Sequence, residues 1–344
     1  MTGVDGIGVV PAPDRNLLTI TYSILSADAL QAEVAQAYAI NTPTTCQLLL
    51  PSMNDTYLLT TRDNRYILRV YRARWRSPSE IAYELELLAH LADRGISVSA
   101  PIADRDGELI RPLLAPEGTR HLVLFTYAEG TYLPLTEGAN SWRIGQVAAA
   151  IHSASGDFVS RHPRFRLDLE YLIDRPLAAV RPFFAQRPDD WEYLEGFAGR
   201  VRARADAMVQ AGLDWGVCHG DLGGGNIHAA EDQTLTVFDF DLCGPGWRAW
   251  DLAAVQRVAT DQNQAGIWDS FMKGYNENRR LAAADLAAVP LFGAIRRLWS
   301  LGLQASNVAD WGILRVSDWI LDSELAFFRK WETEYLDGKQ WSFL

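Results

Sequence analysis

The first third of the chain alternates apolar and polar residues in short runs that turn signals separate. β-branched, aromatic and leucine residues dominate residues 44–50, 56–61 and 65–72. The intervening segments, 51–55 and 63–64, contain Pro, Ser, Asn and Asp, which favour tight turns. The pattern therefore predicts three strands in an antiparallel meander.

Apolar residues at helical spacing predict a helix on each side of this meander. Ser26 is a suitable N-cap for a helix that reaches Tyr38, with apolar residues four positions apart. Ser77 and Pro78 open a second helix that reaches about Asp93. Its apolar side chains form one buried stripe: Ile81, Leu85, Leu87, Leu88 and Leu91.

The pattern changes after a strongly apolar strand at residues 121–127. Before that strand, residues 98–102 lead into a short hairpin around 104–107, and after it helical spacing dominates. The expected helices cover residues 142–154, 191–211, 248–259, 264–279, 283–304 and 307–335. We therefore predict an α+β protein with an N-terminal lobe, residues 1–127, and a C-terminal lobe, residues 128–344.

Composition and charge narrow the function. A length of 344 residues, 48% of them hydrophobic, suits two lobes with a large core. The net charge of −11 argues against nucleic acid or an anionic membrane surface as the main partner. We see no signal peptide, no apolar run near the ~20 residues of a membrane span, and only three scattered cysteines. A cytoplasmic location is expected.

Three polar residues follow two short apolar runs in the middle of the chain. Asp221 comes shortly after residues 217–218, Asn226 lies further along the same loop, and Asp239 directly follows residues 234–238. We expect the two runs to pair as a hairpin, which would place the three side chains on one rim. A carboxylate base with two oxygen ligands for Mg²⁺ is the set that phosphoryl transfer needs.

These residues stand in motifs that resemble the aminoglycoside phosphotransferase and choline kinase superfamily. The matching segments are residues 219–222 (His-Gly-Asp-Leu) with Asn226, 238–241 (Phe-Asp-Phe-Asp) and 250–253 (Trp-Asp-Leu-Ala). Within the superfamily, the chain is most similar to the branch of the type II homoserine kinases and bacterial stress-response kinases. The resemblance implies a two-lobe protein-kinase-like fold, with an antiparallel sheet in the small lobe and ATP bound between the lobes.

The resemblance also implies roles. Asp221 would be the catalytic aspartate that orients the acceptor hydroxyl, while Asn226 and Asp239 would hold Mg²⁺ against the phosphates of ATP. His219 would fix the catalytic loop, and Asp251 would brace it. For Asp241 we favour a structural hydrogen bond over contact with a second metal ion.

Two loops are candidates for contact with phosphate. The glycine run at residues 223–225 lets the backbone approach phosphate or acceptor closely and permits positive φ, although it could equally be an ordinary flexible loop. The loop at residues 51–56 has no glycine, yet Ser52, Asn54 and Thr56 could offer donors to phosphates. An ordinary polar turn explains that loop equally well.

The first lobe should also supply a cation for the ATP phosphates. Protein kinases use a lysine on the third strand, paired with a glutamate on the next helix, but no lysine precedes Lys273 in this chain. Arg69 and Glu84 occupy the matching positions, and arginine can bind phosphate bidentately. The neighbouring arginines are expected at the surface: Arg72, Arg74 and Arg76.

The strand at residues 121–127 is expected to end in the hinge between the lobes. Phe125 and Tyr127 would border the adenine, with backbone groups reading its edge. His152, by contrast, is expected to be a histidine that packs its helix rather than one that binds a ligand.

Three functions remain open. The leading one is an ATP- and Mg²⁺-dependent kinase for a small-molecule hydroxyl on an amino alcohol, a hydroxy amino acid or an aminoglycoside-type antibiotic. A protein Ser/Thr kinase is the second, although the short segment between Asp241 and Asp251 favours a small acceptor. The third is a non-catalytic nucleotide-binding regulator, which the missing lysine supports and the intact Asp221, Asn226 and Asp239 oppose.

The acceptor itself is less well defined. The acidic excess of the C-terminal lobe permits a cationic acceptor, although a solvated acidic surface explains the excess equally well. The tail at residues 339–344 could fold back and bring its carboxylate to the acceptor.

Overall fold

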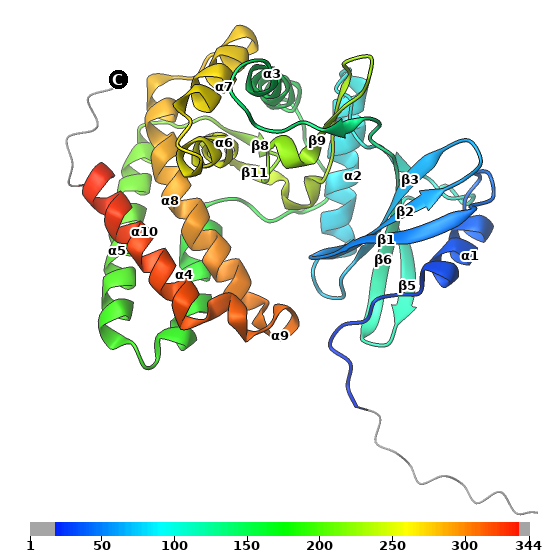
Figure 1. The fold of residues 1–344 in the computed structure, drawn as a ribbon, viewed down its shortest axis with the longest axis horizontal. Helices are drawn as coiled ribbons and strands as arrows, with labels where there is room; N and C mark the ends of the chain where they lie inside the picture. The colour runs from blue at the N-terminus through cyan, green and yellow to red at the C-terminus, as the bar shows by residue number, and fades with distance from the viewer. Residues whose placement is uncertain (1–17, 337–344) are drawn as a thin grey trace, which may run out of the picture.

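A computed structural model describes residues 18–336 and shows a strand-rich lobe followed by a larger helical lobe (Figure 1). The predicted α+β class is therefore confirmed. The expectation for the tail at 339–344 lies outside the described residues.

The first lobe is a six-stranded sheet in the order β1-β2-β3-β6-β4, with β5 also paired to β6. Its strands are β1 (Thr45–Pro51), β2 (Asn54–Thr60), β3 (Arg65–Tyr71), β4 (Pro101–Ile102), β5 (Arg111–Ala115) and β6 (Gly118–Thr126). The first three strands pair antiparallel with tight connections, so the predicted meander is confirmed.

The two faces of this sheet pack against different helices, as Figure 1 shows for α1 (Ala27–Ala37) and α2 (Pro78–Asp93). Leu68 and Val70 of β3 pack in a buried cluster with α1. Because successive side chains of a strand point to opposite faces, Arg69 points the other way, toward α2 and the cleft. The predicted N-caps are both present: Ser26 caps α1, and Ser77 forms a capping box with Glu80 at the start of α2.

The second lobe is built mainly from helices around one large core. The helices are α3 (Ala139–Ala154), α4 (Arg175–Val180), α5 (Pro188–Gln210), α6 (Ala249–Asp261), α7 (Ala265–Asn278), α8 (Ala283–Ser306), α9 (Val308–Trp311) and α10 (Asp318–Tyr335). Short strands join them: β7 (Thr131–Tyr132), β8 (Trp215–Cys218), β9 (Ile227–Ala229), β10 (Leu235–Val237) and β11 (Gly244–Trp247). Since β7 pairs with β9 and not with the first sheet, we propose that the lobes divide after Tyr127.

The hairpin predicted between residues 217–218 and 234–238 is wrong. β8 pairs instead with β11, and β10 pairs with β9. The short loop between β9 and β10 closes at a lower entropy cost than the longer connection from β8 to β10 would. Asn226 and Asp239 still come together, because the Phe238 amide donates to the Asn226 carbonyl oxygen at 3.0 Å.

Two further expectations for the C-terminal lobe need correction. The single helix predicted over 307–335 is three pieces, because Gly312 adopts a positive φ of 88° after α9 and a 3-10 turn, Ile313–Val316, precedes α10. Within residues 18–336, α8 is long and apolar enough to span a membrane, although no such run was expected. Its most apolar window is 61% buried inside the protein, where α8 packs on α4 and α6.

Candidate active site

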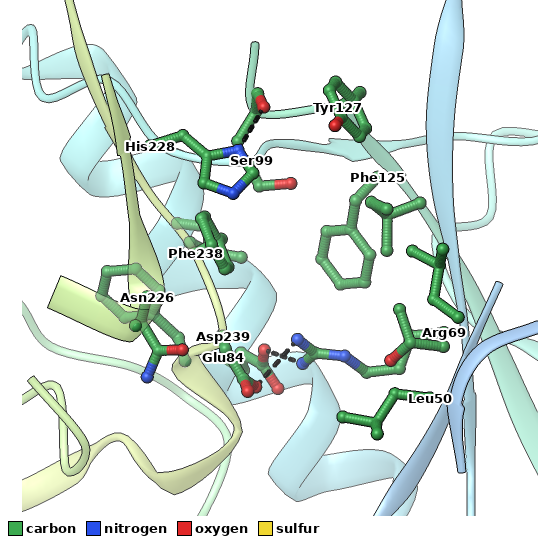
Figure 2. Close-up of a pocket in the computed structure, with 17 residues that line it drawn as sticks. Leu50, Arg69, Glu84, Ser99, Phe125, Tyr127, Asn226, His228, Phe238 and Asp239 are labelled. Atoms are coloured by element: carbon green, nitrogen blue, oxygen red, sulfur yellow. Dashed lines mark hydrogen bonds and ion pairs between the residues drawn. The ribbon is translucent and has the colours of Figure 1, made fainter. Parts of the chain in front are cut away.

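A cavity of about 340 Å³ lies between the two lobes (Figure 2). Its upper part is apolar and aromatic, with Phe125, Tyr127 and Phe238 on its walls, whereas Arg69 and Asp239 lie at the opposite end (Figure 2). An apolar slot that ends in charged groups is suited to a flat ring joined to an ionic chain.

The charged end is organised around Arg69. Its Nη1 donates to Glu84 Oε1 at 2.8 Å, and its Nη2 donates to Asp239 Oδ1 at 3.0 Å (Figure 2). Tyr71, two residues along β3 on the same face, donates its hydroxyl to Glu84 Oε2 at 3.0 Å. Burial disfavours the charged guanidinium, but Glu84 and Asp239 outweigh burial and raise the pKa of Arg69. The side chain is therefore a fixed cation that connects both lobes.

Asp221 lies at the edge of this site, on the loop after β8. Its Oδ1 accepts from Arg296 Nη2 and its Oδ2 accepts from Asn226 Nδ2, each at 3.2 Å. Half of the Asp221 side chain remains exposed. Asp221 and Asp239 line one small cavity together with Arg69, Ser52 and Asn54. A hydroxyl near Asp221 would thus lie beside the charged end of the larger cavity.

Asp239 has an unusual backbone conformation. Its φ of 63° and ψ of 58° lie in the left-handed region, which aspartate adopts more readily than most residues other than glycine. The conformation turns the chain sharply between β10 and the following 3-10 turn, Phe240–Leu242. Strained backbone of this kind concentrates at functional sites.

The loop that carries Asp221 is held on its buried side by hydrogen bonds to Asp251. Asp251 Oδ2 accepts from the His219 amide at 2.7 Å, and its Oδ1 accepts from the Gly220 amide at 2.8 Å. Burial would raise the pKa of Asp251, but the hydrogen bond from His152, the interactions with the two histidines and the Gly220 amide outweigh burial and lower the pKa. Trp250 adds a bond from its Nε1 to the Gly220 carbonyl oxygen at 3.0 Å. The loop is therefore rigid on its buried side.

Two histidines complete this support. His219 accepts from the Asp221 amide through Nδ1 and donates through Nε2 to the Phe238 carbonyl oxygen, so it connects Asp221 to the turn that carries Asp239. His152 lies 3.1 Å from Asp251 through Nε2 and 2.9 Å from the Tyr275 hydroxyl through Nδ1. His152 packs between α3 and α7 as predicted, but it also orients the carboxylate that holds the loop.

The buried His152 makes a pH effect measurable. Burial lowers its pKa below the ordinary value of 6.5, so below pH 6.5 the unfolded chain binds a proton that the folded chain does not. The free energy of unfolding should fall as pH drops from 6.5 to 5, by up to about 1.4 kcal/mol per pH unit from this group. In His152→Gln, whose amide can still donate to Asp251, urea unfolding should show a shallower pH slope. Parallel pH profiles of the two proteins would contradict this role of His152.

Asp241 forms a buried contact that joins the two lobes, and this contact is called the joint below. Its Oδ2 accepts from Trp75 Nε1 at 2.8 Å and its Oδ1 accepts from Arg76 Nε at 3.2 Å. Burial would raise the pKa of Asp241, but Arg76 and Arg69 outweigh burial and lower it. Arg164 donates to the Asp241 carbonyl oxygen as well. The surface position predicted for Arg76 is wrong, because Arg76 is buried as the partner of Asp241; Arg72 is also largely covered, whereas Arg74 is exposed.

The loop at residues 51–56 is shorter than expected. β1 continues to Pro51 and β2 begins at Asn54, so Ser52 and Met53 alone form the turn. Among the described residues, the buried Asn54 Oδ1 has no hydrogen-bond partner. Asn54 lines the same small cavity as Asp221 and Asp239, so its amide is the polar group that this turn brings to the charged end.

The hinge places Phe125 and Tyr127 on the wall of the cavity, as Figure 2 shows. Thr126 is already bonded through its backbone: its amide donates to Ala100 O at 2.9 Å, and its carbonyl accepts from Ser99. The Ala128 carbonyl accepts from His228 Nδ1 at 2.7 Å. We therefore expect the backbone of Tyr127 to be the first candidate for reading an adenine edge.

The glycine run does not adopt positive φ at any of its three positions. What restricts it is a close contact, because a Cβ on Gly224 would lie 2.2 Å from the Leu133 carbonyl oxygen. A Cβ on Gly223 would meet no atom within 4 Å. The run is therefore constrained by packing at Gly224 and open at Gly223.

These two glycines form a matched pair for a test. Gly224→Ala should destabilise the protein by about 1–3 kcal/mol, because the Leu133 backbone must move. Gly223→Ala should stay within about 0.5 kcal/mol of the parent protein. Urea denaturation of both variants measures the difference, and equal stabilities would show that the contact at Gly224 is relieved without cost.

The donor set fits a hard divalent cation such as Mg²⁺. Asn226 uses its nitrogen to donate to Asp221, which leaves its amide oxygen for a metal ion. Asp239 uses Oδ1 for Arg69, and its half-exposed side chain leaves Oδ2 toward the cavity. Carboxylate and amide oxygens are the ligands that Mg²⁺ prefers.

Arg296 is the main contact of Asp221 that the sequence did not predict. It lies on α8, is buried, and donates from Nη1 to the Gly220 carbonyl oxygen at 2.9 Å as well as to Asp221. The sequence signal for this contact is that Arg296 and Arg297 are adjacent in a strongly apolar helix. Since most of such a helix is buried, one of the two arginines is expected on its buried face. A buried arginine requires a carboxylate or carbonyl partner, although the sequence alone does not show which one.

Comparisons with known proteins support one family. Residues 49–288 match the model of the phosphotransferase enzyme family. A Deinococcus radiodurans protein described as uncharacterized is 39% identical over 319 residues, which cover 91% of this chain and 92% of that protein. The homoserine kinase of Methylobacterium radiotolerans is 27% identical over 294 residues, which cover 83% and 86%.

Solved structures agree with the fold. A microcompartment-associated aminopropanol kinase superposes with a TM-score of 0.72 at 24% identity, over 90% of this chain and 98% of that chain. An amicoumacin kinase in complex with AMP-PNP and Ca²⁺ gives a TM-score of 0.69 at 21% identity, over 90% and 94%. The predicted two-lobe protein-kinase-like fold is therefore confirmed.

Proposed function

The chain belongs to the phosphotransferase enzyme family, and from that premise we propose that it transfers the γ-phosphate of ATP to a hydroxyl of a small molecule. One observation carries the proposal: Asp221 and Asp239 line the same small cavity, next to the fixed guanidinium of Arg69. A base, a metal ligand and a phosphate-binding cation thus lie side by side.

We place ATP in the larger cavity. The adenine would occupy the apolar slot at Phe125 and Tyr127, and the phosphates would extend toward Arg69. Arg69 would keep its bond to Glu84 and direct its other nitrogen to phosphate oxygens, because a guanidinium can bind two acceptors at once. Mg²⁺ held by Asn226 and Asp239 would neutralise the charge on the phosphates.

The transfer step needs little covalent chemistry from the protein. Asp221 would accept a hydrogen bond from the acceptor hydroxyl and take its proton as the oxygen bonds to the γ-phosphorus. The bond between that phosphorus and the bridging oxygen breaks, and ADP leaves. Arg296 and Asn226 would hold the Asp221 carboxylate in the orientation this step requires.

The relatives favour a small acceptor. They include a homoserine kinase and an aminopropanol kinase, whose names describe small hydroxyl compounds. The short segment between Asp241 and Asp251 contains β11, which pairs with β8, and the start of α6, and this leaves little chain there for docking a peptide. We further propose a cytoplasmic location, where ATP is abundant.

The test is transfer from γ-labelled ATP to a panel of small alcohols, followed by separation of phosphorylated products. Label should move to at least one alcohol in the presence of Mg²⁺, and chelation of divalent ions should stop the transfer. If the protein binds ATP but neither transfers nor hydrolyses it with Mg²⁺ present, the regulator hypothesis replaces this one.

A further inference from the structure

A second cavity, of about 260 Å³, adjoins Asp221 on the side of the second lobe. It shares Gly225 and Asn226 with the larger cavity, so a molecule bound here would lie beside the proposed ATP site. The remaining lining comes from the segment after the hinge, the glycine run and the end of α6, which contributes Arg257. On the proposed function, this cavity is the place for the acceptor.

The charges in this cavity are few. Asp221 and Arg257 are the only ionisable acidic or basic side chains in its described lining. Asp221 already faces the guanidinium of Arg296 at 3.2 Å. The carboxylate available to a cationic acceptor in this lining is therefore Asp221, which is already paired with an arginine. Such an acceptor would also have to approach the positive charge of Arg257.

We propose that the acceptor is a small alcohol that carries a carboxylate, and that Arg257 binds this carboxylate while Asp221 receives the hydroxyl. Arginine matches a carboxylate with two parallel hydrogen bonds, which also fixes the direction of the bound molecule. The proposal rests on the function proposed above, and it names a class of acceptor that the family assignment alone does not specify.

The surroundings of Arg257 fit this role. Arg257 bonds to Asp261, one turn further along α6, at 3.0 Å, and the two side chains are 45% and 44% exposed. Such an exposed pair contributes little stability, so a ligand carboxylate can compete for the guanidinium. Burial lowers the pKa of Arg296, and the positive charge of Arg257 lowers it further. Asp221 and Asp251 act in the opposite direction but do not outweigh burial. Arg257 therefore lies close enough to the pair of Arg296 and Asp221 for its charge to act there.

The acidic excess of the second lobe does not extend to this cavity. The acidic excess made a cationic acceptor plausible from the sequence, yet the cavity beside Asp221 contains no further acidic side chain among its described residues. The excess therefore belongs to other parts of the lobe. Amino alcohols without a carboxylate, and aminoglycosides, become the disfavoured acceptors.

The experiment compares compounds that differ only in the proposed anchor. L-homoserine and 4-hydroxybutanoate carry the carboxylate, and 3-aminopropan-1-ol is L-homoserine without it. Serine with ethanolamine provides a second such pair. With Mg²⁺-ATP, at least one carboxylated alcohol should be phosphorylated with a kcat/KM at least about tenfold above that of its counterpart, because a charge-assisted pair is lost in the latter.

Two variants test whether Arg257 binds the carboxylate of the acceptor. Arg257→Gln should raise KM for the carboxylated alcohol about tenfold, change kcat little, and leave KM for ATP unchanged. The control is Arg202→Gln, since Arg202 on α5 is also a part-exposed arginine paired with carboxylates, Asp174 at 3.1 Å and Asp206 at 4.0 Å, and it lies outside this cavity. The control should retain the parent kinetics.

Two kinetic results would overturn the inference even if a carboxylated alcohol is phosphorylated. One is equal or better turnover of the amines than of their carboxylated counterparts. The other is an unchanged KM in Arg257→Gln. If no carboxylated alcohol is phosphorylated while Mg²⁺-dependent ATP hydrolysis persists and requires Asp221, the inference about the acceptor fails and the proposed function stands. If ATP is not turned over at all, the proposed function fails as well.

Discussion

Asp221→Asn is expected to lower kcat by a factor on the order of 10³, because the hydroxyl of the acceptor would lose the base that orients it and takes its proton. The amide is close in size to the carboxylate, and its oxygen can still accept from Arg296, so the loop should keep its position. Asp221 does not line the larger cavity. Nucleotide affinity should therefore stay within about twofold of the parent value, since the contacts proposed for ATP are intact.

Steady-state transfer and nucleotide titration by calorimetry measure the two quantities separately. Asp206→Asn is a suitable control, because it makes the same chemical change at a half-exposed carboxylate on α5. Should Asp221→Asn and Asp206→Asn transfer phosphate at equal rates, Asp221 is not the base.

The second large effect is expected at Arg69. In Arg69→Met the fully buried Glu84 keeps its charge without a cationic partner, or must take up a proton. Breaking a buried ion pair from one side costs about 3–5 kcal/mol of the free energy of unfolding. Phosphoryl transfer should also fall steeply, because the cation proposed to meet the ATP phosphates is gone.

A double variant separates the two consequences. Arg69→Met combined with Glu84→Gln removes the buried charge on both sides, so most of the lost stability should return while transfer stays low. Arg69→Lys tests whether a lysine, as in protein kinases, can serve here. If Arg69→Met unfolds at the same urea concentration as the parent protein, the ion pair contributes no stability.

The sequence predicted local elements well where their signal is local. Ser77 and the apolar stripe behind it mark α2, and the period of two along β3 explains why Arg69 and Tyr71 share a face. The pairing of β8 with β11 was not predictable in the same way, because nothing within either strand identifies its partner. Strand partners are selected by tertiary packing, which a single sequence shows only indirectly.

The candidate site shows the same difference between local and distant signals. Asp221, Asn226 and Asp239 lie close in sequence beside short strands, which suggested that they meet. The structure does bring them together, although not on the hairpin that was predicted. Arg296 and Arg257 come from helices far along the chain. Their approach to Asp221 depends on how α6 and α8 pack, so the sequence could show that a buried arginine needs a partner but not which partner it has.

The joint at Asp241 has a consequence for control of activity. Rotation of one lobe against the other would pull Trp75 and Arg76 away from a carboxylate that is shielded from water. Breaking a buried, hydrogen-bonded charge is costly, so a widely opened form should be scarcely populated at rest. We therefore expect an enzyme that needs no separate activation step, so that its rate in the cell depends on the concentrations of its two substrates.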